Sequence, residues 1–236
     1  MALTAAAPVP HTLIAYLDQH SRQETVHQHA VTVNVSWWNH RTEPLRGGPV
    51  VASGQTAGRH PITRADLFQL GEEAVHDDSG TGAVRLLWHA LAWGTGTKHR
   101  NNKRRIRSVL DDDEAPTVLY EAARASRTDP SAAFSILRQR RKNYFTWLGP
   151  NFFTKFLYFA GGGDPAHPSL IVDQFVRASL YRETGIDPRF RYISQYPVSR
   201  YVETLDQLAA WAGAAQAEVG RPVAPDEVER WAFSVR

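Results

Sequence analysis

The chain has 236 residues, of which 42% are hydrophobic, and this length suits one large domain or a core with a small additional lobe. A hydrophobic share of that size excludes wholesale disorder, and the absence of cysteine excludes disulfides and zinc–thiolate sites. The formal net charge is only +3, so any attraction for a polyanion must come from local clusters of charge.

The sequence predicts a protein without a membrane span, because no apolar run approaches the roughly 20 residues that a spanning helix needs. The first ten residues lack a basic segment and a long apolar segment, so we expect no secretion signal and a cytoplasmic location. We also expect a monomer. Ten histidines leave a metal hydrolase as an alternative class, but His27 and His29 are their only close pair. We therefore expect no metal site and no cofactor.

Residues 1–62 are predicted to form a small mixed lobe. Residues 11–23 place aliphatic side chains on one side, as a short helix does. Residues 31–38 alternate β-branched and polar side chains, which favours a strand. Residues 44–62 are rich in proline and glycine and are predicted to be a loop.

From residue 63 onward the pattern is helical. Thr63 and Asp66 have the spacing of a capping box at a helix start. Residues 82–93 are apolar on nearly every face and predict a buried central helix that the following glycines end. Further helices are expected over residues 116–126, 130–142, 150–160, 173–183, 201–219 and 225–233. The predicted fold class is therefore mainly α, with a helical core over residues 63–236.

Lysine and arginine gather in two places. Residues 98–107 have the sequence KHRNNKRRIR and residues 138–142 have the sequence RQRRK, while acidic residues cluster elsewhere. Such clusters are typical of a surface that binds a polyanion. Two solvated helix faces would give the same pattern, and charge by itself favours that second interpretation.

Residues 147–180 contain the candidate chemistry. Gly149 and Pro150 form a tight entry to a helix that carries Lys155 beside a row of aromatic residues. Asp173 follows 18 positions after Lys155, where it can cap the next helix and stay ionised. A lysine can act as a nucleophile and a carboxylate can stabilise positive charge. A surface lysine and an ordinary capping aspartate remain the alternative from spacing alone.

This arrangement resembles the helix-hairpin-helix DNA glycosylases, most closely the branch that contains 8-oxoguanine DNA glycosylase. In that family a hairpin bears a catalytic lysine preceded by threonine, and a catalytic aspartate follows at a similar distance. Thr154, Lys155 and Asp173 match this motif. The resemblance covers residues 63–236 and implies a hairpin around residues 145–160, catalytic roles for the lysine and the aspartate, and double-stranded DNA with a modified base as the partner.

Two weaker matches concern the flipped base. The family's last core helix carries a base-reading glutamine and, four residues later, a stacking phenylalanine followed by serine. Glu229 and Phe233 occupy these places, and Phe159 stands where the family has a pocket cysteine. The family also has an asparagine-rich turn that fills the gap left by the flipped base, for which Asn101 or Asn102 is the candidate. The resemblance implies a base pocket and DNA contacts from Lys98, Arg100, Asn101, Asn102, Lys103, Arg104, Arg105 and Gly149.

The differences from the family bear on the substrate. The hairpin has the sequence LGPNFF, with one glycine where the family has two. The Glu229 carboxylate accepts hydrogen bonds, and the N4 amine of cytosine donates them. The branch includes anti-phage enzymes that remove glucosylated hydroxymethylcytosine, so we favour a bulky modified cytosine of phage DNA over 8-oxoguanine. Lys155 would form a Schiff base and could then support strand cleavage as a lyase. A non-catalytic DNA-binding module on the same scaffold is the alternative.

Overall fold

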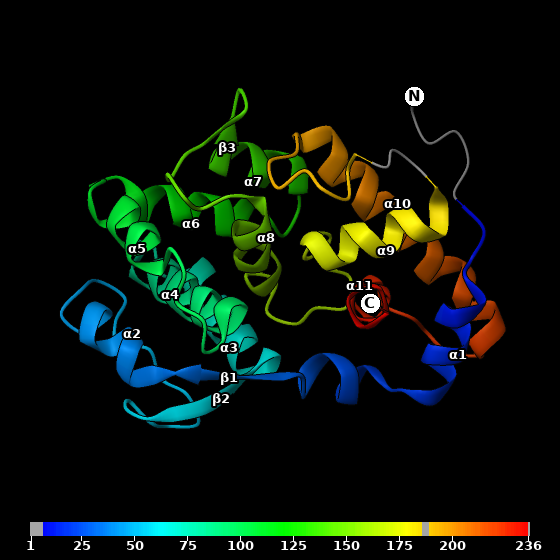
Figure 1. The fold of residues 1–236 in the computed structure, drawn as a ribbon, viewed down its shortest axis with the longest axis horizontal. Coiled ribbons are helices and arrows are strands. Elements are labelled where there is room, and N and C mark those ends of the chain that lie inside the picture. The colour runs from blue at the N-terminus through cyan, green and yellow to red at the C-terminus, as the bar shows by residue number, and fades with distance from the viewer. Residues whose placement is uncertain (1–6, 186–188, 236) are drawn as a thin grey trace.

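The computed structural model describes residues 7–185 and 189–235, and the outer ends of the predicted domains, residues 1–6 and 236, lie outside them (Figure 1). Helices make up most of the described chain, accompanied by two small antiparallel sheets. The predicted mainly α fold class with small α/β elements is confirmed. Among the described residues, no helix combines the length and the apolarity that a membrane span requires.

The N-terminal segment runs along one edge of the molecule and contacts both ends of the helical core (Figure 1). Its elements are α1 His11–Gln19, the short π-helix η1 Gln23–His27, β1 Ala30–Asn34 and α2 Val35–Thr42. β1 lies against α4, whereas α1 lies against α10 and α11. The segment therefore joins two parts of the core that are far apart in sequence.

Two N-terminal predictions are corrected. The strand expected over residues 31–38 ends at Asn34, because the Asn34 side chain accepts a hydrogen bond from the Trp37 amide and caps α2. The loop expected over residues 44–62 ends in a strand, β2 Arg59–Thr63, which pairs antiparallel with β1. The Pro61 in β2 hid this strand, although a proline is tolerated at a sheet edge.

The core helices follow the predicted order with shifted ends, except that the helix over residues 102–110 was not predicted. The bounds are α3 Arg64–His76, α4 Thr81–Thr95, α5 Asn102–Leu110, α6 Ala115–Ala125, α7 Pro130–Leu137, α8 Pro150–Phe159, α9 Gln174–Thr184, α10 Val198–Val219 and α11 Pro225–Ser234. The capping box of Thr63 and Asp66 at the start of α3 is confirmed. Gly94 lies inside α4 and does not end it, because the helix continues to Thr95.

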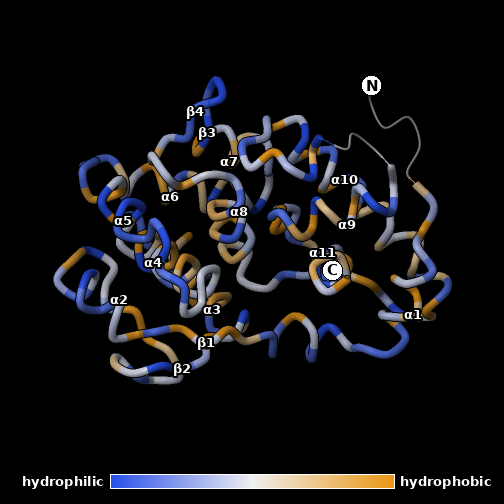
Figure 2. The backbone as a smooth tube through the Cα atoms, in the orientation of Figure 1, coloured by the Kyte–Doolittle hydropathy of each residue, from blue (hydrophilic) through white to orange (hydrophobic). Residues whose placement is uncertain are grey.

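The helix expected over residues 130–142 is wrong in its last part. It ends at Leu137, and β3 Arg138–Gln139 and β4 Lys142–Asn143 form a hairpin beyond it. Arg140 and Arg141 have φ angles of 43° and 70°, in the left-handed region that a right-handed helix excludes. The basic cluster at residues 138–142 is thus a protruding hairpin, whose hydrophilic tip stands out in Figure 2.

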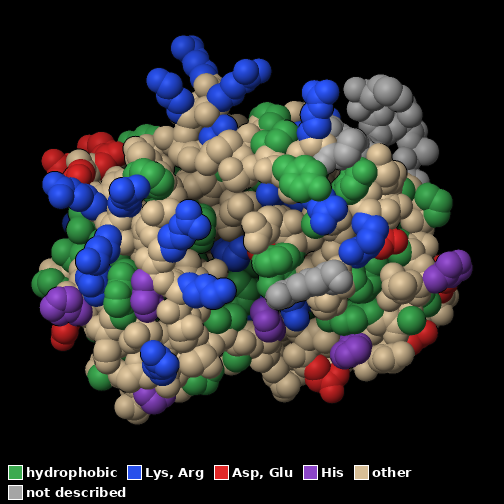
Figure 3. All heavy atoms as spheres, in the orientation of Figure 1, with side chains coloured by type: hydrophobic (Ala, Val, Ile, Leu, Met, Phe, Trp, Pro, Cys, Tyr) green, Lys and Arg blue, Asp and Glu red, His purple; other side chains and the backbone are tan. Residues whose placement is uncertain are grey.

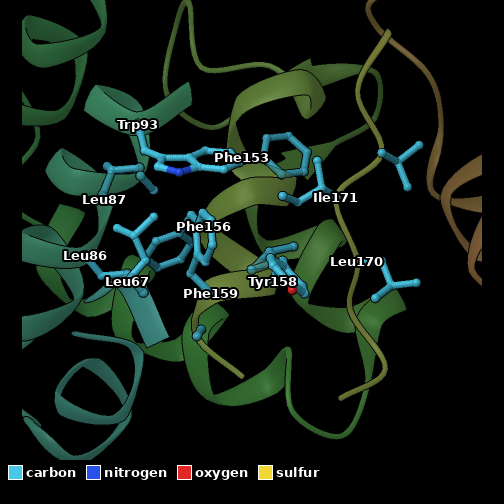
Figure 4. Close-up of a cluster of buried hydrophobic side chains, with 14 of the residues drawn as sticks. Leu67, Leu86, Leu87, Trp93, Phe153, Phe156, Tyr158, Phe159, Leu170 and Ile171 are labelled. Atoms are coloured by element: carbon cyan, nitrogen blue, oxygen red, sulfur yellow. The ribbon is translucent and has the colours of Figure 1, made fainter. Parts of the chain in front are cut away.

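α4 and α8 form the centre of the core. Both helices are buried on nearly every face, and α4 packs against α3, α6 and α8. Figure 4 shows leucines of α3 and α4 facing the aromatic side chains of α8. α3 and α8 approach so closely that a Cβ on Gly71 would lie 1.9 Å from the Phe159 carbonyl oxygen. The core thus holds α8, which carries Lys155, rigidly from several sides.

Three core-facing histidines are electrically neutral in the fold. The His89 Nδ1 donates to the Arg85 carbonyl at 2.8 Å, and its Nε2 accepts from the Val51 amide at 2.9 Å. Burial lowers the pKa of His89 to about 4, and it also lowers the pKa values of His167 and His29, to about 4 and about 3. All three sit below the ordinary value of 6.5 for the unfolded chain.

We expect the free energy of unfolding to fall as the pH is lowered from about 6.5 towards 4, because unfolded histidines then bind protons that the buried ones exclude. Each such histidine contributes up to about 1.4 kcal/mol per pH unit in this window. Urea unfolding at several pH values should show a shallower dependence in His89→Gln. The exposed His40→Gln variant should keep the wild-type dependence, and equal slopes in all three proteins would contradict this account.

Candidate active site

Lys155 lies inside the protein. It belongs to α8, for which Gly149 is the N-cap residue and Pro150 the first helical residue. The residue is only 6% exposed, because both sides of α8 are covered by the core. The alternative interpretation of Lys155 as a surface lysine is therefore wrong.

Lys155 and Asp173 form a buried ion pair, with the lysine Nζ 2.9 Å from the aspartate Oδ2. The other oxygen, Oδ1, accepts from the amides of Phe175 and Val176, so Asp173 caps α9 as predicted. Burial opposes ionisation of Asp173, but the Lys155 ammonium and the two amides outweigh it and lower the pKa of the carboxyl. The site therefore holds an ammonium and a carboxylate in contact.

The stem of Lys155 occupies a space that α4 leaves open. A Cβ on Gly94 would lie 3.0 Å from the lysine Cδ, so a glycine at this position allows the two helices to meet. The lysine Nζ also donates to the Asn151 carbonyl at 3.0 Å. The Thr154 hydroxyl accepts from the Val172 amide at 3.3 Å and so ties the loop before Asp173 to α8. Sequence patterns gave no signal for the role of Gly94.

The three predicted pocket residues differ in their accessibility. Phe233 is partly exposed, and its ring lies 5.3 Å from the ring of Phe175, which is two residues after Asp173. Phe159 is 0% exposed and packs against Trp93, so its ring offers no open face. Glu229 is also 0% exposed. Only Phe233 presents a surface on which a base could stack.

Glu229 is engaged by an arginine that is distant in sequence. Its two carboxylate oxygens accept from the Arg64 guanidinium at 2.8 and 3.2 Å. Arg64 also donates to the Tyr158 hydroxyl, which in turn donates to Asp226 at 3.0 Å. Asp226 is paired with Arg22 through both of its oxygens. This chain of contacts neutralises the buried Arg64 and the half-buried Arg22, and it joins α3, α8 and α11.

Four buried polar atoms in the cluster formed by His29, Trp93, Arg64 and Arg230, of which His29 and Arg230 lie next to Phe233, have no hydrogen-bond partner among the described residues: Trp93 Nε1, His29 Nδ1, Arg64 Nε and Arg230 NH1. The His29 ring lies 5.2 Å from Trp93 and 6.2 Å from Phe233, and the Arg230 guanidinium lies 5.3 Å from Phe233. Three of these four groups can only donate hydrogen bonds. Sequence reasoning missed them, since nothing local marks an unpaired donor.

The basic segment at residues 98–107 divides into exposed and buried parts. Lys98, Arg100, Lys103 and Arg104 are exposed. Arg105 is buried and donates to the Trp147 carbonyl and to the Asn102 side chain. Arg105 could therefore make its predicted direct contact with DNA only if part of the DNA reached this buried side chain.

Asn101 and Asn102 are separated by the fold. Asn102 is 0% exposed, and its amide nitrogen donates to the Thr95 hydroxyl at 3.0 Å. Asn101 is partly exposed and has a left-handed φ of 64° at the start of α5. Of the two candidates for filling the gap behind a flipped base, Asn101 is the accessible one.

Three buried arginines surround the start of α8 and contact only neutral acceptors. Arg105 bonds to the Trp147 carbonyl, and Arg177 bonds to the Asn151 side chain at 2.6 Å. Arg138 bonds to Gln195, whose Nε2 would lie 2.7 Å from a Cβ on Gly149. No carboxylate among the described residues hydrogen-bonds to any of the three. Their charge adds to the positive end of the α8 dipole.

One face of the molecule gathers these cations. Figure 3 shows Lys and Arg side chains around a hollow near the centre of this face, while Asp and Glu lie towards its margins. The exposed basic residues of α5 and of the β3–β4 hairpin belong to the two basic clusters at residues 98–107 and 138–142. A polyanion would be attracted to this face.

A family model described as "Putative 8-oxoguanine DNA glycosylase OGG-like protein" matches residues 24–233. The chain belongs to this OGG-like family. Comparisons with curated proteins and with solved structures found no match. Family membership confirms the resemblance to the 8-oxoguanine DNA glycosylase branch and supports a DNA glycosylase-like function with DNA as the partner.

The histidine pair that a metal hydrolase would need is not assembled in this OGG-like protein. His27 contacts the Arg22 guanidinium at 2.9 Å, whereas the His29 ring packs against Trp93. Among residues 7–185 and 189–235, no group of three or more potential ligands is placed to hold a metal ion.

Replacing Glu229 by Gln should destabilise this OGG-like protein by about 3 kcal/mol, because it leaves the Arg64 guanidinium buried without its counterion. Urea unfolding at neutral pH measures the change. The matched control is Glu73→Gln, which removes the partner of Arg85 from an exposed pair and should change stability little. Equal stability of Glu229→Gln and the wild type would show that Arg64 does not depend on Glu229.

Proposed function

We propose that this OGG-like protein is a DNA glycosylase that removes a modified base, with Lys155 as nucleophile and Asp173 as the stabilising carboxylate. The observation that supports this most is the buried contact of 2.9 Å between Lys155 Nζ and Asp173 Oδ2. A lone buried ammonium would be costly, and a pair placed beside a cationic face matches the needs of the reaction.

The reaction follows from the properties of the two groups. The Nζ lone pair bonds to C1′ of the deoxyribose as the C1′–N bond breaks, and that electron pair leaves with the base. The proton that the lysine ammonium loses balances the proton that the departing base gains. Positive charge that develops on the sugar lies near the Asp173 carboxylate, which is held ionised by two amides. Opening of the sugar ring then gives a Schiff base, from which lyase cleavage can follow.

The cationic face would hold the duplex while the target nucleotide leaves the stack. A base inside a duplex cannot present C1′ to a buried lysine, so it must be flipped out at a cost of a few kcal/mol. Exposed Arg104 and Lys103 can contact phosphates, and the arginines around the start of α8 would receive a phosphate near Gly149. These contacts are independent of sequence.

The unpaired donors bear on which base is removed. Both oxygens of Glu229 are engaged by Arg64, so Glu229 offers no free acceptor to the N4 amine of a cytosine. Trp93 Nε1 and Arg64 Nε instead offer hydrogen bonds to carbonyl oxygens. We therefore favour an oxidised purine such as 8-oxoguanine as the substrate. Glucosylated hydroxymethylcytosine of phage DNA, with an anti-phage role, is the competing substrate, and excision assays on oligonucleotides carrying each base distinguish the two.

Borohydride should trap a covalent complex between the wild-type protein and DNA that contains the substrate base, and Lys155→Ala should give none. Asp173→Asn should keep DNA binding, since asparagine also caps helices, but excision should fall by about 100-fold or more because the charge is lost. Gel analysis of the trapped complex and single-turnover excision measure these effects. Glu73→Gln, which changes the charge of an exposed pair away from the site, serves as the control. Efficient excision by Lys155→Ala would overturn the nucleophile assignment.

Arg104→Ala should reduce the slope of log K against log salt by about 0.9, the value for one lost phosphate contact. Arg105→Ala should in addition lower thermal stability, because this side chain links the Trp147 carbonyl to Asn102 inside the protein. Anisotropy titrations at several salt concentrations and thermal unfolding separate the two effects. An unchanged slope in Arg104→Ala would place α5 away from the DNA.

A further inference from the structure

The β3–β4 hairpin has a feature that phosphate binding does not explain. Its strands pair Arg138 with Asn143 and Gln139 with Lys142, so Arg140 and Arg141 alone form the two-residue connection. Both have positive φ angles, which is the geometry of a type I′ turn. Glycine and asparagine adopt this conformation readily, whereas a side chain such as arginine does so at a conformational cost. The two arginines at the tip therefore adopt a backbone conformation that arginine disfavours.

The root of this hairpin is anchored to the protein. The buried Arg138 side chain donates across the strands to Asn143 and also to the Gln195 side chain and the Tyr196 carbonyl. The Tyr144 amide donates to the Leu137 carbonyl at 2.9 Å and closes the base of the hairpin. The hairpin therefore projects in a fixed direction, as Figures 1 and 3 show.

The tip of the hairpin is unoccupied by protein contacts. Arg140, Arg141 and Lys142 are exposed, and none of their side chains forms a hydrogen bond or ion pair with another residue in the described part of the chain. The root, by contrast, lies against the start of α8, where Gln195 and Asn143 flank Gly149. A duplex held at the start of α8 would thus have the tip beside it.

We propose that the β3–β4 hairpin is a minor-groove finger, in which Arg140 and Arg141 enter the minor groove of the duplex that supplies the base to Lys155. This inference rests on the proposed function. Each strand has only two residues, so the ribbon is short and the two arginine side chains are its outermost part. The minor groove, about 6 Å wide, is too narrow for a two-stranded ribbon but admits extended arginine side chains.

The electrostatics favour the same groove. A narrow minor groove, as in A-tracts, concentrates negative potential and attracts arginine in particular. The planar guanidinium is less strongly hydrated than an ammonium and so loses less on entering a confined space. A contact with phosphates alone would need no tight turn, because flexible exposed side chains such as Lys142 can reach them. The finger therefore predicts a preference for A·T-rich flanks without contact to specific bases in the major groove.

The test compares two duplexes with the same substrate base, one flanked by an A-tract and one by G·C pairs, at equal salt. The wild type should bind the A-tract duplex at least about threefold more tightly than the G·C duplex, because arginine is attracted to a narrow minor groove. A drug that occupies the minor groove, such as netropsin, should remove this preference. The double variant Arg140→Asn with Arg141→Gly restores the preferred residues of a type I′ turn, so it should fold and yet bind both duplexes equally. Lys142→Ala should weaken both complexes by the same factor.

Borohydride trapping on the same duplexes separates the two levels of the argument. If Lys155 is still trapped but the wild type binds both duplexes equally, or the double variant keeps the preference, the finger is wrong and the proposed function stands. If the wild type neither traps nor binds either duplex, the proposed function fails and the finger with it. Trapping by both proteins together with loss of the A-tract preference in the double variant is the expected result.

Discussion

An ammonium group inside an apolar core must have a negative partner close by, and much of this structure serves that requirement. Lys155 sits on a helix that is covered on both sides, so its charge would be prohibitively costly without Asp173. The loop that follows α8 returns the chain so that Asp173 meets the lysine and caps α9 at once. Thr154 fixes this loop to α8, and Gly94 leaves space for the lysine stem.

Five arginines that are buried or half-buried fall into two groups that are distinguished by their partners. Arg22 and Arg64 are neutralised by Asp226 and Glu229, and they tie distant parts of the chain together. The second group bonds only to carbonyl and amide oxygens and is concentrated around the start of α8: Arg105, Arg138 and Arg177. Neutral partners satisfy the hydrogen bonds of these groups but leave their charge in place, and that charge is what a DNA phosphate would meet.

Hydrogen-bond partners also distinguish the polar groups around Phe233, where the base is proposed to bind. Both Glu229 oxygens are engaged by Arg64, while the Trp93 indole and the Arg230 guanidinium each have a donor without a partner in the described part of the chain. A buried donor without a partner carries a desolvation cost that a ligand with carbonyl oxygens can relieve. In the proposed base pocket, polar groups without a partner would matter as much as the aromatic ring that would stack on the base.

Local patterns in the sequence determined the central helix over residues 82–93, the capping box at Thr63, and the placement of Lys155 and Asp173 on consecutive helices. These features depend on neighbouring residues, because helix periodicity and caps are set within a few positions. The pairing of β2 with β1, the engagement of Glu229 by Arg64 and the hairpin at residues 138–143 were decided by tertiary structure alone. Arg64 and Glu229 are 165 positions apart, so their contact depends on how the helices pack and not on neighbouring residues in the sequence.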